Sequence, residues 1–468
     1  MGTGGPRVPQ TGGRMTFSEL VALIQAEDIH WVDLRATDLL GRLRCLTLPA
    51  GEVSPARFEK GVGAPTSHYG VEGDGDLVLL PDLSTARVDP TRDPPSVVIL
   101  CDLGRPGEGL HPFAPRSVAR AAEALLASAG LADEARFGIE LEFYLFASVL
   151  REDGPLSQAV EVVPVGPAEP SDVPGPRTAY HAGGPEDSGR RLRERVAEVL
   201  GGWGIPVRYH HHEGGPLGQM EIELGLGRLL DAADWTALAV DLVSRVASEE
   251  GMVACFLPKP LSAEAGSGLH FHQLLLKGGE NLFSGGGGLS ETALHYVGGL
   301  LAHGRALSAL VSPSTNSYRR LGPGFEAPVH LAFGRGNRTT AVRIPGYLTD
   351  PSQARIEYRP PDPTANPYLA LSACLMAGID GIRQGLDPVA KGWGPFASGA
   401  EPLGRRRRVA ALPRSLAEAL DALRRDQEFL TLGGVFPEEL LARWISIKEA
   451  EVRAVAARPH PYEFFLYA

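Results

Sequence analysis

Cysteine is scarce in this chain, and no two cysteines lie close together. The four that occur, Cys45, Cys101, Cys255 and Cys374, form no Cys-x-x-Cys pair. This spacing does not favour a disulfide framework or a zinc site built on paired cysteines. Scattered cysteines are typical of a reducing compartment, so we expect a cytoplasmic protein with buried free thiols.

Long apolar runs and a secretion signal are also missing. No stretch reaches the roughly 20 apolar residues of a membrane helix, and the start, "MGTGGPRVPQTGGR", has no apolar core. We therefore expect no membrane partner and interpret residues 1–15 as a disordered tail, with Met15 as an alternative start. The glycines at 285–288 are not followed by Lys and Ser or Thr, so they predict a flexible loop rather than a phosphate-binding loop.

Excess positive charge is absent as well. The 468 residues carry a formal charge of −11, which argues against nucleic acid as a partner. The arginines at 405–408 are interpreted as a solvated face. A content of 43% hydrophobic and 22% charged residues is that of a soluble globular protein. At this length such a chain is expected to form two domains.

The predicted elements divide the chain into two parts. Residues 16–112 contain a helix followed by short strands and end near a Pro- and Gly-rich segment, which predicts a mixed β domain. Residues 113–468 alternate strands and helices, apart from a proline-rich excursion at 150–178. There is no internal repeat.

Four predicted strands of the second part carry acidic, imidazole or guanidinium groups on one face. Side chains at i and i+2 of a strand share a face. The sets are Glu140 with Glu142, Glu221 with Glu223, His270 with His272, and Glu357 with Arg355 and Arg359. A single polar face is usually solvated, but converging carboxylates raise one another's pKa unless a cation lies among them. Oxygen-rich sites with an occasional imidazole suit Mg²⁺ or Mn²⁺.

Arginines form a second set, in the segments 318–328, 334–346 and 355–361. Arginine binds carboxylates and phosphates through two parallel hydrogen bonds. Metal ions together with several arginines are what phosphoryl transfer requires. Salt bridges within the core are the alternative interpretation for any single arginine here.

These motifs resemble the glutamine synthetase family. "ELEF", "HHHEGGPLGQMEIE", "GSGLHFHQ", "NSYRRLGPGFEAP", "NRTTAVRIPG", "RIEYRPPDPTANPYLALSA" and the terminal "PHPYEFFLY" follow the family's order. The resemblance implies an α+β fold, with an N-terminal β-grasp domain at 16–112. It also implies a catalytic domain at 113–468, in which helices flank a curved, metal-lined antiparallel sheet. A homo-oligomer is expected, typically a dodecamer of two hexameric rings with active sites between subunits.

The resemblance also implies ATP-dependent chemistry, in which the glutamate γ-carboxylate becomes an acyl phosphate and an amine displaces the phosphate. Two or three Mg²⁺ (or Mn²⁺) ions per site are expected, with ATP as a co-substrate. The implied ligands are Glu142, Glu213 and Glu221 for one ion, and Glu140, His270 and Glu357 for another. The histidines at 210–212 are expected mainly to shape the end of a strand.

Further roles follow from the same resemblance. The expected glutamate-binding residues are Arg320, Arg359, Glu142 and Gly266, and those for ATP are His272, Arg343 and Arg355. Arg338 would contact the transferring phosphate. Glu326 lies on a loop that would close over the intermediate, where its carboxylate would accept a proton from the amine. Glu223 has no implied role.

The sequence departs from the family pattern at three places. The segment "GVGAPTSHYGV" at 61–71 has Pro65 about where ammonia-using members carry an acid, and Ala265 stands where Asn is usual. The segment at 404–413 lacks the tyrosine that some members have adenylylated. We therefore expect a ligase that joins glutamate to an organic amine such as a polyamine, ethanolamine or an aromatic amine. An ammonia-using glutamine synthetase, a ligase for another acid, and an inactive scaffold or regulator are the alternatives.

Overall fold

The structure is a computed structural model that describes residues 15–71, 75–154, 156–165, 179–286, 288–322, 324–347, 350–397 and 409–467. Residues 1–14 of the expected tail, residues 155 and 166–178 of the proline-rich excursion, and the arginines at 405–408 lie outside these ranges.

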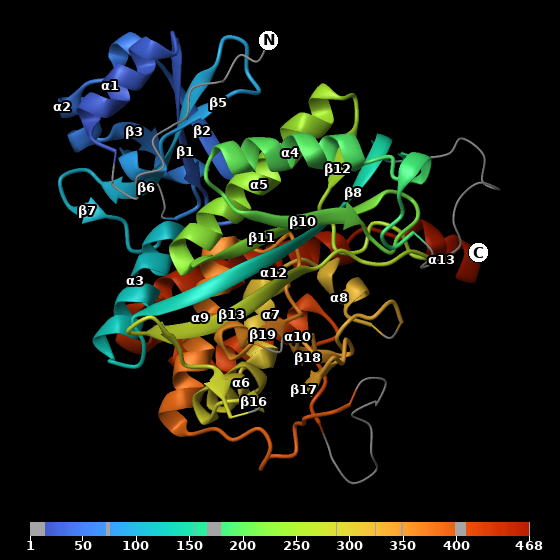
Figure 1. The fold of residues 1–468 in the computed structure, drawn as a ribbon. Helices are drawn as coiled ribbons and strands as arrows, with labels where there is room; N and C mark the ends of the chain where they lie inside the picture. Colours follow the sequence, from blue (N-terminus) through green and yellow to red (C-terminus); the bar gives the residue numbers. More distant parts are fainter. Residues whose placement is uncertain are drawn as a thin grey trace.

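The N-terminal part is a sheet with two helices beside it (Figure 1). Helix α1 (Phe17–Ala26) begins at a capping box, in which Thr16 and Glu19 satisfy each other's backbone N–H groups. The strands are β1 (Trp31–Thr37), β2 (Leu43–Pro49), β3 (Val62–Pro65), β4 (Asp76–Pro81), β5 (Arg87–Asp89), β6 (Ser96–Arg105) and β7 (Gly109–Leu110), with α2 (Pro55–Lys60) between β2 and β3. The main order is β2-β1-β6-β4-β3, in which only β1 and β6 run parallel.

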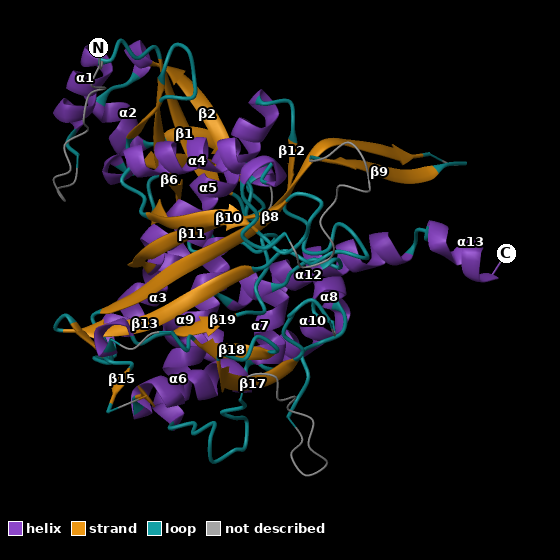
Figure 2. Cartoon of the chain, turned by 45° about the vertical axis from the view of Figure 1, so that its right-hand side comes forward, coloured by secondary structure: helices purple, strands orange, loops and turns teal. Residues whose placement is uncertain are grey.

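A larger curved sheet forms the centre of the second part (Figure 2). Its order is β10 (Val207–His212), β11 (Gln219–Arg228), β8 (Glu134–Asp153), β13 (Leu269–Lys277), β19 (Ile356–Tyr358), β18 (Thr340–Ile344) and β17 (His330–Arg335). Strands β9 (Gln158–Pro164) and β12 (Val253–Cys255) pair with β8. Neighbours along this order are antiparallel, as expected, except for β17 and β18, which run parallel.

Helices cover the apolar face of this sheet. Strand residues such as Ile139, Leu141, Ile222 and Phe271 are fully buried, and the buried helices α3 (Pro115–Ser128) and α5 (Leu229–Glu249) pack against β8. The remaining longer helices are α4 (Arg190–Gly202), α6 (Glu291–Ala302), α7 (Gly304–Val311), α9 (Pro367–Gln384), α10 (Leu416–Arg425) and α12 (Glu438–Ala456). Alternation along the strands therefore leaves the polar side chains on the opposite face.

Helices α6 and α9 pack almost backbone to backbone at the centre of this layer. A Cβ at Gly299 of α6 would lie 1.9 Å from the carbonyl oxygen of Ala377 in α9. Such an approach leaves no room for a side chain, which explains why "NPYLALSACLMAGIDGIRQG" is rich in small residues. Asn366 caps the start of α9, and Gly385 ends it in the left-handed conformation.

Buried ion pairs and hydrogen bonds join the two sheets. Arg116 at the start of α3 lies 3.0 Å from both Asp82 and Asp102 of the N-terminal part and 2.8 Å from Asp234 of α5. None of the helices in the described part of the chain combines the length and the apolar character that crossing a bilayer requires.

Candidate active site

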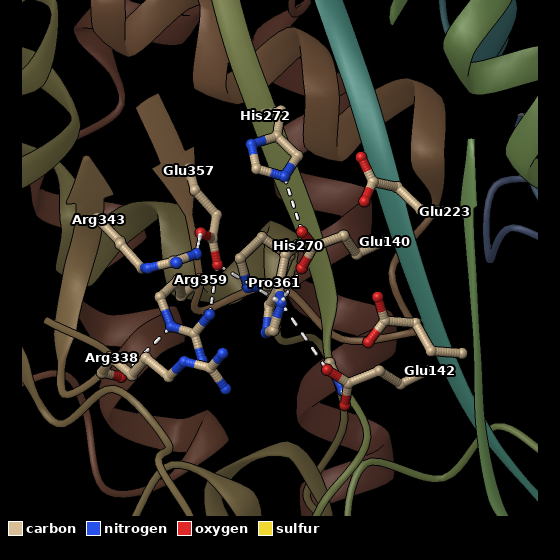
Figure 3. A network of polar contacts seen from close by, with 12 residues as sticks. Glu140, Glu142, Glu223, His270, His272, Arg338, Arg343, Glu357, Arg359 and Pro361 are labelled. Atoms are coloured by element: carbon tan, nitrogen blue, oxygen red, sulfur yellow. Dashed lines mark hydrogen bonds and ion pairs between the residues drawn. The ribbon is translucent and has the colours of Figure 1, made fainter. Parts of the chain in front are cut away.

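Strand register places the acidic and imidazole side chains side by side on the polar face. Glu140 of β8 lies opposite Glu223 of β11 on one side and His270 of β13 on the other. Glu142 lies opposite Glu221, and His272 lies opposite Glu357. Directly opposed residues of antiparallel strands project from the same face. The residues that strand alternation assigned to a common face therefore form one continuous acidic surface (Figure 3).

This surface forms the floor of a cavity of about 660 Å³. Its walls come from segments far apart in the sequence. Of the expected site residues, the cavity is lined by Glu140, Glu142, Glu213, Glu221, Gly266, His270, Arg320, Glu326, Arg338, Arg343 and Arg359. Glu357 is fully buried beneath it. His272 and Arg355 line a neighbouring cavity of about 350 Å³, together with Arg208 and Glu223.

Three groups of side chains within the described residues bring possible metal ligands within 4.8 Å of one another. One is Glu140, His270 and Glu357, the set expected for one ion. A second joins Glu213 and Glu221 to His211, which lies opposite Glu221 on β10. The third is Glu140, Glu223 and His272. The sequence motifs implied no role for Glu223 and predicted His211 mainly as a residue that shapes the strand end, although His211 lies opposite Glu221 on β10.

Electrostatics at this floor favour a cation. Burial, and then the neighbouring Glu221 and Glu142 carboxylates, raise the pKa of Glu213 well above its usual range. The pKa of Glu221 is raised in the same way, by burial and by Glu140. Oxygen Oε2 of Glu213 and Oε2 of Glu223 are buried without a hydrogen-bond partner among the described residues. Carboxylates with unsatisfied oxygens beside imidazoles fit Mg²⁺ or Mn²⁺.

Glu142 makes different contacts from Glu213 and Glu221. Its Oε2 accepts a hydrogen bond of 2.7 Å from the backbone N–H of Gly268. The side chain of Gln219 also donates to this oxygen, at 3.5 Å. The carboxylate is therefore held at the cavity wall and lies 3.7 Å from Nδ1 of His270.

Glu140 and Glu357 are already paired with cationic or donor groups. Glu140 lies between two imidazoles, 2.8 Å from Nδ1 of His270 and 2.7 Å from Nε2 of His272. Burial alone would raise the pKa of Glu140, but these imidazoles lower it well below its usual range. Glu357 forms ion pairs with Arg343 and Arg359, and although burial opposes this, Arg359 lowers the pKa of Glu357.

Arg320 is buried against the segment that carries Gly266 and Gly268. Its guanidinium donates to the carbonyls of Pro360 and Pro361, at 3.0 and 3.1 Å. A Cβ at Gly266 would lie 2.8 Å from Cγ of Arg320, and one at Gly268 would lie 2.5 Å from its Nη2. Glycine is therefore required here because the backbone passes directly over the arginine.

The loop that carries Glu326 lies at the mouth of the cavity. Glu326 accepts a hydrogen bond of 2.8 Å from Arg338, and its backbone carbonyl accepts one of 3.3 Å from Arg359. Phe325 and Glu326 both have positive φ, 50° and 57°, which is unfavourable for side chains of this size. The ammonium of Lys259 lies 4.2 Å from the centre of the Phe325 ring. These contacts hold a strained loop over the cavity.

The segment at 61–71 lies away from this cavity in the same chain. Pro65 ends β3 and lines a separate groove of about 460 Å³ with Arg44, Cys45 and His68. Register places Asp76 of β4 directly opposite Pro65. A carboxylate thus lies beside Pro65, although the linear segment contains none.

Ala265 lies in the cavity wall, where its carbonyl accepts a hydrogen bond of 2.7 Å from the hydroxyl of Tyr144. The segment at 404–413 has no tyrosine that could be adenylylated. Its residues 404–408 lie outside the described residues.

Comparisons with known proteins give matches over nearly the whole chain. The family described as "Glutamine synthetase, catalytic domain" matches residues 112–467. A glutamine synthetase of Methylococcus capsulatus is 40% identical over 97% of this chain and 99% of its own. A 3-hydroxylaminophenol mutase of Cupriavidus pinatubonensis is 38% identical, with the same coverage.

Solved structures are similar over nearly the whole chain. A cryo-EM structure of Plasmodium falciparum glutamine synthetase has a TM-score of 0.87 at 25% identity, and covers 97% of this chain and 99% of its own. A structure of apo GmaS has a TM-score of 0.79 at 28% identity, and covers 95% and 98%.

Proposed function

The chain belongs to the glutamine synthetase family of ATP-dependent carbon–nitrogen ligases, and we propose that it joins the γ-carboxylate of glutamate to an organic amine. The observation that carries this proposal is the contact between Glu326 and Arg338 at the mouth of an acid-lined cavity. It sets a proton acceptor beside a cation suited to a transferring phosphate.

The proposed reaction has two displacements. An oxygen of the glutamate γ-carboxylate attacks the γ-phosphorus of ATP, and the bond to ADP breaks. The amine nitrogen then attacks the acyl carbon, Glu326 takes a proton from it, and phosphate leaves with the bonding electron pair. Divalent cations held by the floor carboxylates would neutralise charge on the phosphates.

The arginines and glycines have separate proposed roles. Arg320 and Arg359 orient glutamate, whose chain passes Glu142 and Gly266. Arg338 stabilises the transferring phosphoryl group. The proposed ATP-phosphate ligands are Arg343, Arg355 and His272. In this structure Arg343 is paired with Glu357, and His272 with Glu140.

The preference for an organic amine rests on Pro65 and Ala265. Ammonium is small and strongly hydrated, so its site must replace water with anionic or acceptor groups. Proline offers no such group, and alanine leaves space in the cavity wall. A larger amine gains about 0.8 kcal/mol for each methylene it buries. Two or three methylenes therefore give about 2 kcal/mol, or roughly 30-fold, which is enough to reverse a preference.

An ammonia-using glutamine synthetase is the second candidate. The carboxylate of Asp76 opposite Pro65 favours it, because this group could host ammonium in place of the missing acid. Relatives named glutamine synthetase, such as that of Methylococcus capsulatus, favour it as well.

The proposed assembly is a homo-oligomer, a dodecamer of two rings, with sites completed by the N-terminal part (16–112) of a neighbour. Two observations support it. The groove with Pro65 lies apart from the cavity of its own chain, and the C-terminal helix α13 (Pro461–Tyr467) exposes several aromatic side chains.

The test is phosphate release from ATP and glutamate with Mg²⁺, using ammonia, ethylamine, ethanolamine, putrescine and benzylamine as acceptors. We expect ammonia to have a lower kcat/KM than at least one organic amine. Pro65→Asp should shift the ratio towards ammonia, and Asp76→Asn should shift it away. An enzyme that uses ammonia at millimolar KM and none of the amines is a plain glutamine synthetase. No turnover with any acceptor would indicate the scaffold alternative.

A further inference from the structure

Aromatic side chains form one wall of the catalytic cavity. Tyr180 and Tyr209 both line it, and each is 42% exposed. The ring of His211 lies between them, edge-on to Tyr180 at 5.2 Å and nearly parallel to Tyr209 at 6.0 Å. We call these three residues the aromatic wall. A row of exposed rings that faces a cavity offers binding surface for another apolar group.

His181 braces this wall from behind. Its ring stacks on Tyr180 at 4.1 Å and meets His211 edge-on at 4.5 Å. The backbone N–H of His181 donates to the carbonyl of His212 at 3.0 Å, which ties the segment to the end of β10. His181 has φ of +60°, a left-handed conformation that a residue with a side chain rarely adopts. The ring contacts compensate for this backbone conformation and hold Tyr180 in place.

The wall adjoins the proposed reaction centre. Tyr180 and Arg338 line the same cavity, and the Arg338 guanidinium also holds Glu326. On the other side, Nδ1 of His211 lies 3.6 Å from the carboxylate of Glu213. A group that lies against Tyr180 is therefore in the cavity that holds the carboxylate proposed to take a proton from the amine.

Charges of both signs flank the aromatic wall. The cavity that Tyr180 lines also holds the Glu213 carboxylate and the Arg338 guanidinium. One ring face of Tyr209 is covered by Arg208, whose guanidinium carbon lies 5.4 Å from the ring centre. Beside these fixed charges, the exposed rings offer flat carbon surface on which an aromatic ring can stack.

We propose that the aromatic wall selects amines that carry an aromatic ring, which stacks on Tyr180 while the amine nitrogen reaches Glu326. This inference rests on the proposed ligase function and narrows its acceptor to aryl and arylalkyl amines. His181 acts as a positioning residue, because it touches Tyr180 and His211 but does not line the cavity. A stacked aromatic pair of this kind corresponds to about fivefold in affinity, or about 1 kcal/mol.

The experiment compares benzylamine with cyclohexylmethylamine, which has the same number of carbons and a similar size but no aromatic ring. Phosphate release is measured with saturating ATP and glutamate, at equal concentrations of free base. We expect the KM of benzylamine to be about fivefold lower or more, and putrescine to be the poorest of the three. In Tyr180→Leu the two KM values should converge, while those of ATP and glutamate stay within about twofold.

Matched variants separate the ring from the hydroxyl. Tyr180→Phe keeps the ring and loses only the hydroxyl, so it should keep the benzylamine preference. His181→Ala should raise the KM of benzylamine without an equal fall in kcat, and His181→Phe, which can stack in the same way, should restore it. A purely structural role of His181 would change KM and kcat together for every amine.

Opposite results overturn the inference in distinguishable ways. Equal KM values for benzylamine and cyclohexylmethylamine, a preference for putrescine, or an unchanged ratio in Tyr180→Leu would each exclude aromatic selection while leaving the amine ligase intact. Turnover with ammonia alone would overturn the proposed function and this inference together.

Discussion

The carboxylate of Glu326 lies 2.8 Å from Nη1 of Arg338, at the open mouth of the cavity. Both side chains are about half exposed, at 54% and 43%. Ion pairs this accessible contribute only about 0–1 kcal/mol to stability. The pairing therefore cannot be explained by folding alone. It places the proposed proton acceptor beside the proposed phosphate-binding cation.

Replacing Glu326 should affect turnover far more than folding or nucleotide binding. An amine attacks only as its neutral form, so Glu326→Ala should reduce kcat by roughly 10²-fold or more. Nucleotide affinity should stay within a few-fold, and the free energy of unfolding within about 1 kcal/mol. Steady-state kinetics, nucleotide titration and urea unfolding measure the three quantities. Weakened nucleotide binding with normal residual turnover would contradict the assigned role.

Removing one floor carboxylate should stabilise the protein when metal is absent. Because the pKa of Glu213 is raised in the folded state, its ionisation disfavours folding. The stability of chelator-treated protein should therefore fall as pH rises from about 4.3, the ordinary glutamate pKa, through the raised folded-state value. Glu213→Gln should weaken this pH dependence and raise the unfolding temperature of metal-free protein at about pH 8.

Addition of Mg²⁺ provides the control for Glu213→Gln. Binding to the folded state alone should raise the unfolding temperature of the wild-type protein, and the variant should respond less. If Mg²⁺ raised the unfolding temperature of the variant as much as that of the wild-type protein, Glu213 would not be a metal ligand.

A partly buried histidine away from the cavity predicts a separate pH effect. His303, between α6 and α7, lies 2.8 Å from Asp380 of α9 and 2.9 Å from Asp426, which follows α10. Burial opposes protonation of His303, but the two carboxylates raise its pKa above the usual value. Its contribution to stability is thus fully present below about pH 6.5 and is lost as pH rises through the folded-state pKa.

The variant His303→Asn tests this contribution. Relative to the wild-type protein, we expect the variant to lose more free energy of unfolding at about pH 6 than at about pH 9. Urea unfolding at the two pH values measures this difference. Phe429 stacks on His303 at 4.0 Å, and a loss from this ring contact alone would be the same at both pH values.

The C-terminal helix should matter for assembly and not for folding. In helix α12, Leu441 and Trp444 are buried within their own chain. The exposed apolar surface lies on α13, where Phe465 is 85% and Tyr467 84% exposed, standing away from the body (Figure 2).

Deleting residues 459–468 should therefore lower the mass of the assembly, as light scattering would measure, and leave the circular dichroism spectrum unchanged. The double substitution Phe465→Ser and Tyr467→Ser should have the same effect in a chain of full length. An unchanged mass in both variants would exclude α13 from the interface.

Local patterns predicted the polar faces of the strands. Glu140 with Glu142 and His270 with His272 could be assigned to common faces because side chains alternate along any strand. Glycines at 266 and 268 could be recognised as close approaches, although the partner, Arg320, could not be named. The pairing of Glu326 with Arg338 could not be predicted from the sequence either, because it depends on a loop with positive φ.

The sequence by itself determined which residue types line the site and, through its ordered motifs, the family to which the chain belongs. Tertiary structure alone decided that Glu223 lies opposite Glu140, that His211 joins Glu213 and Glu221, and that Asp76 lies opposite Pro65. The physical reason is register. A strand's alternation is encoded in consecutive residues, whereas the partner of each residue across the sheet is set by packing and by the loops that return the chain.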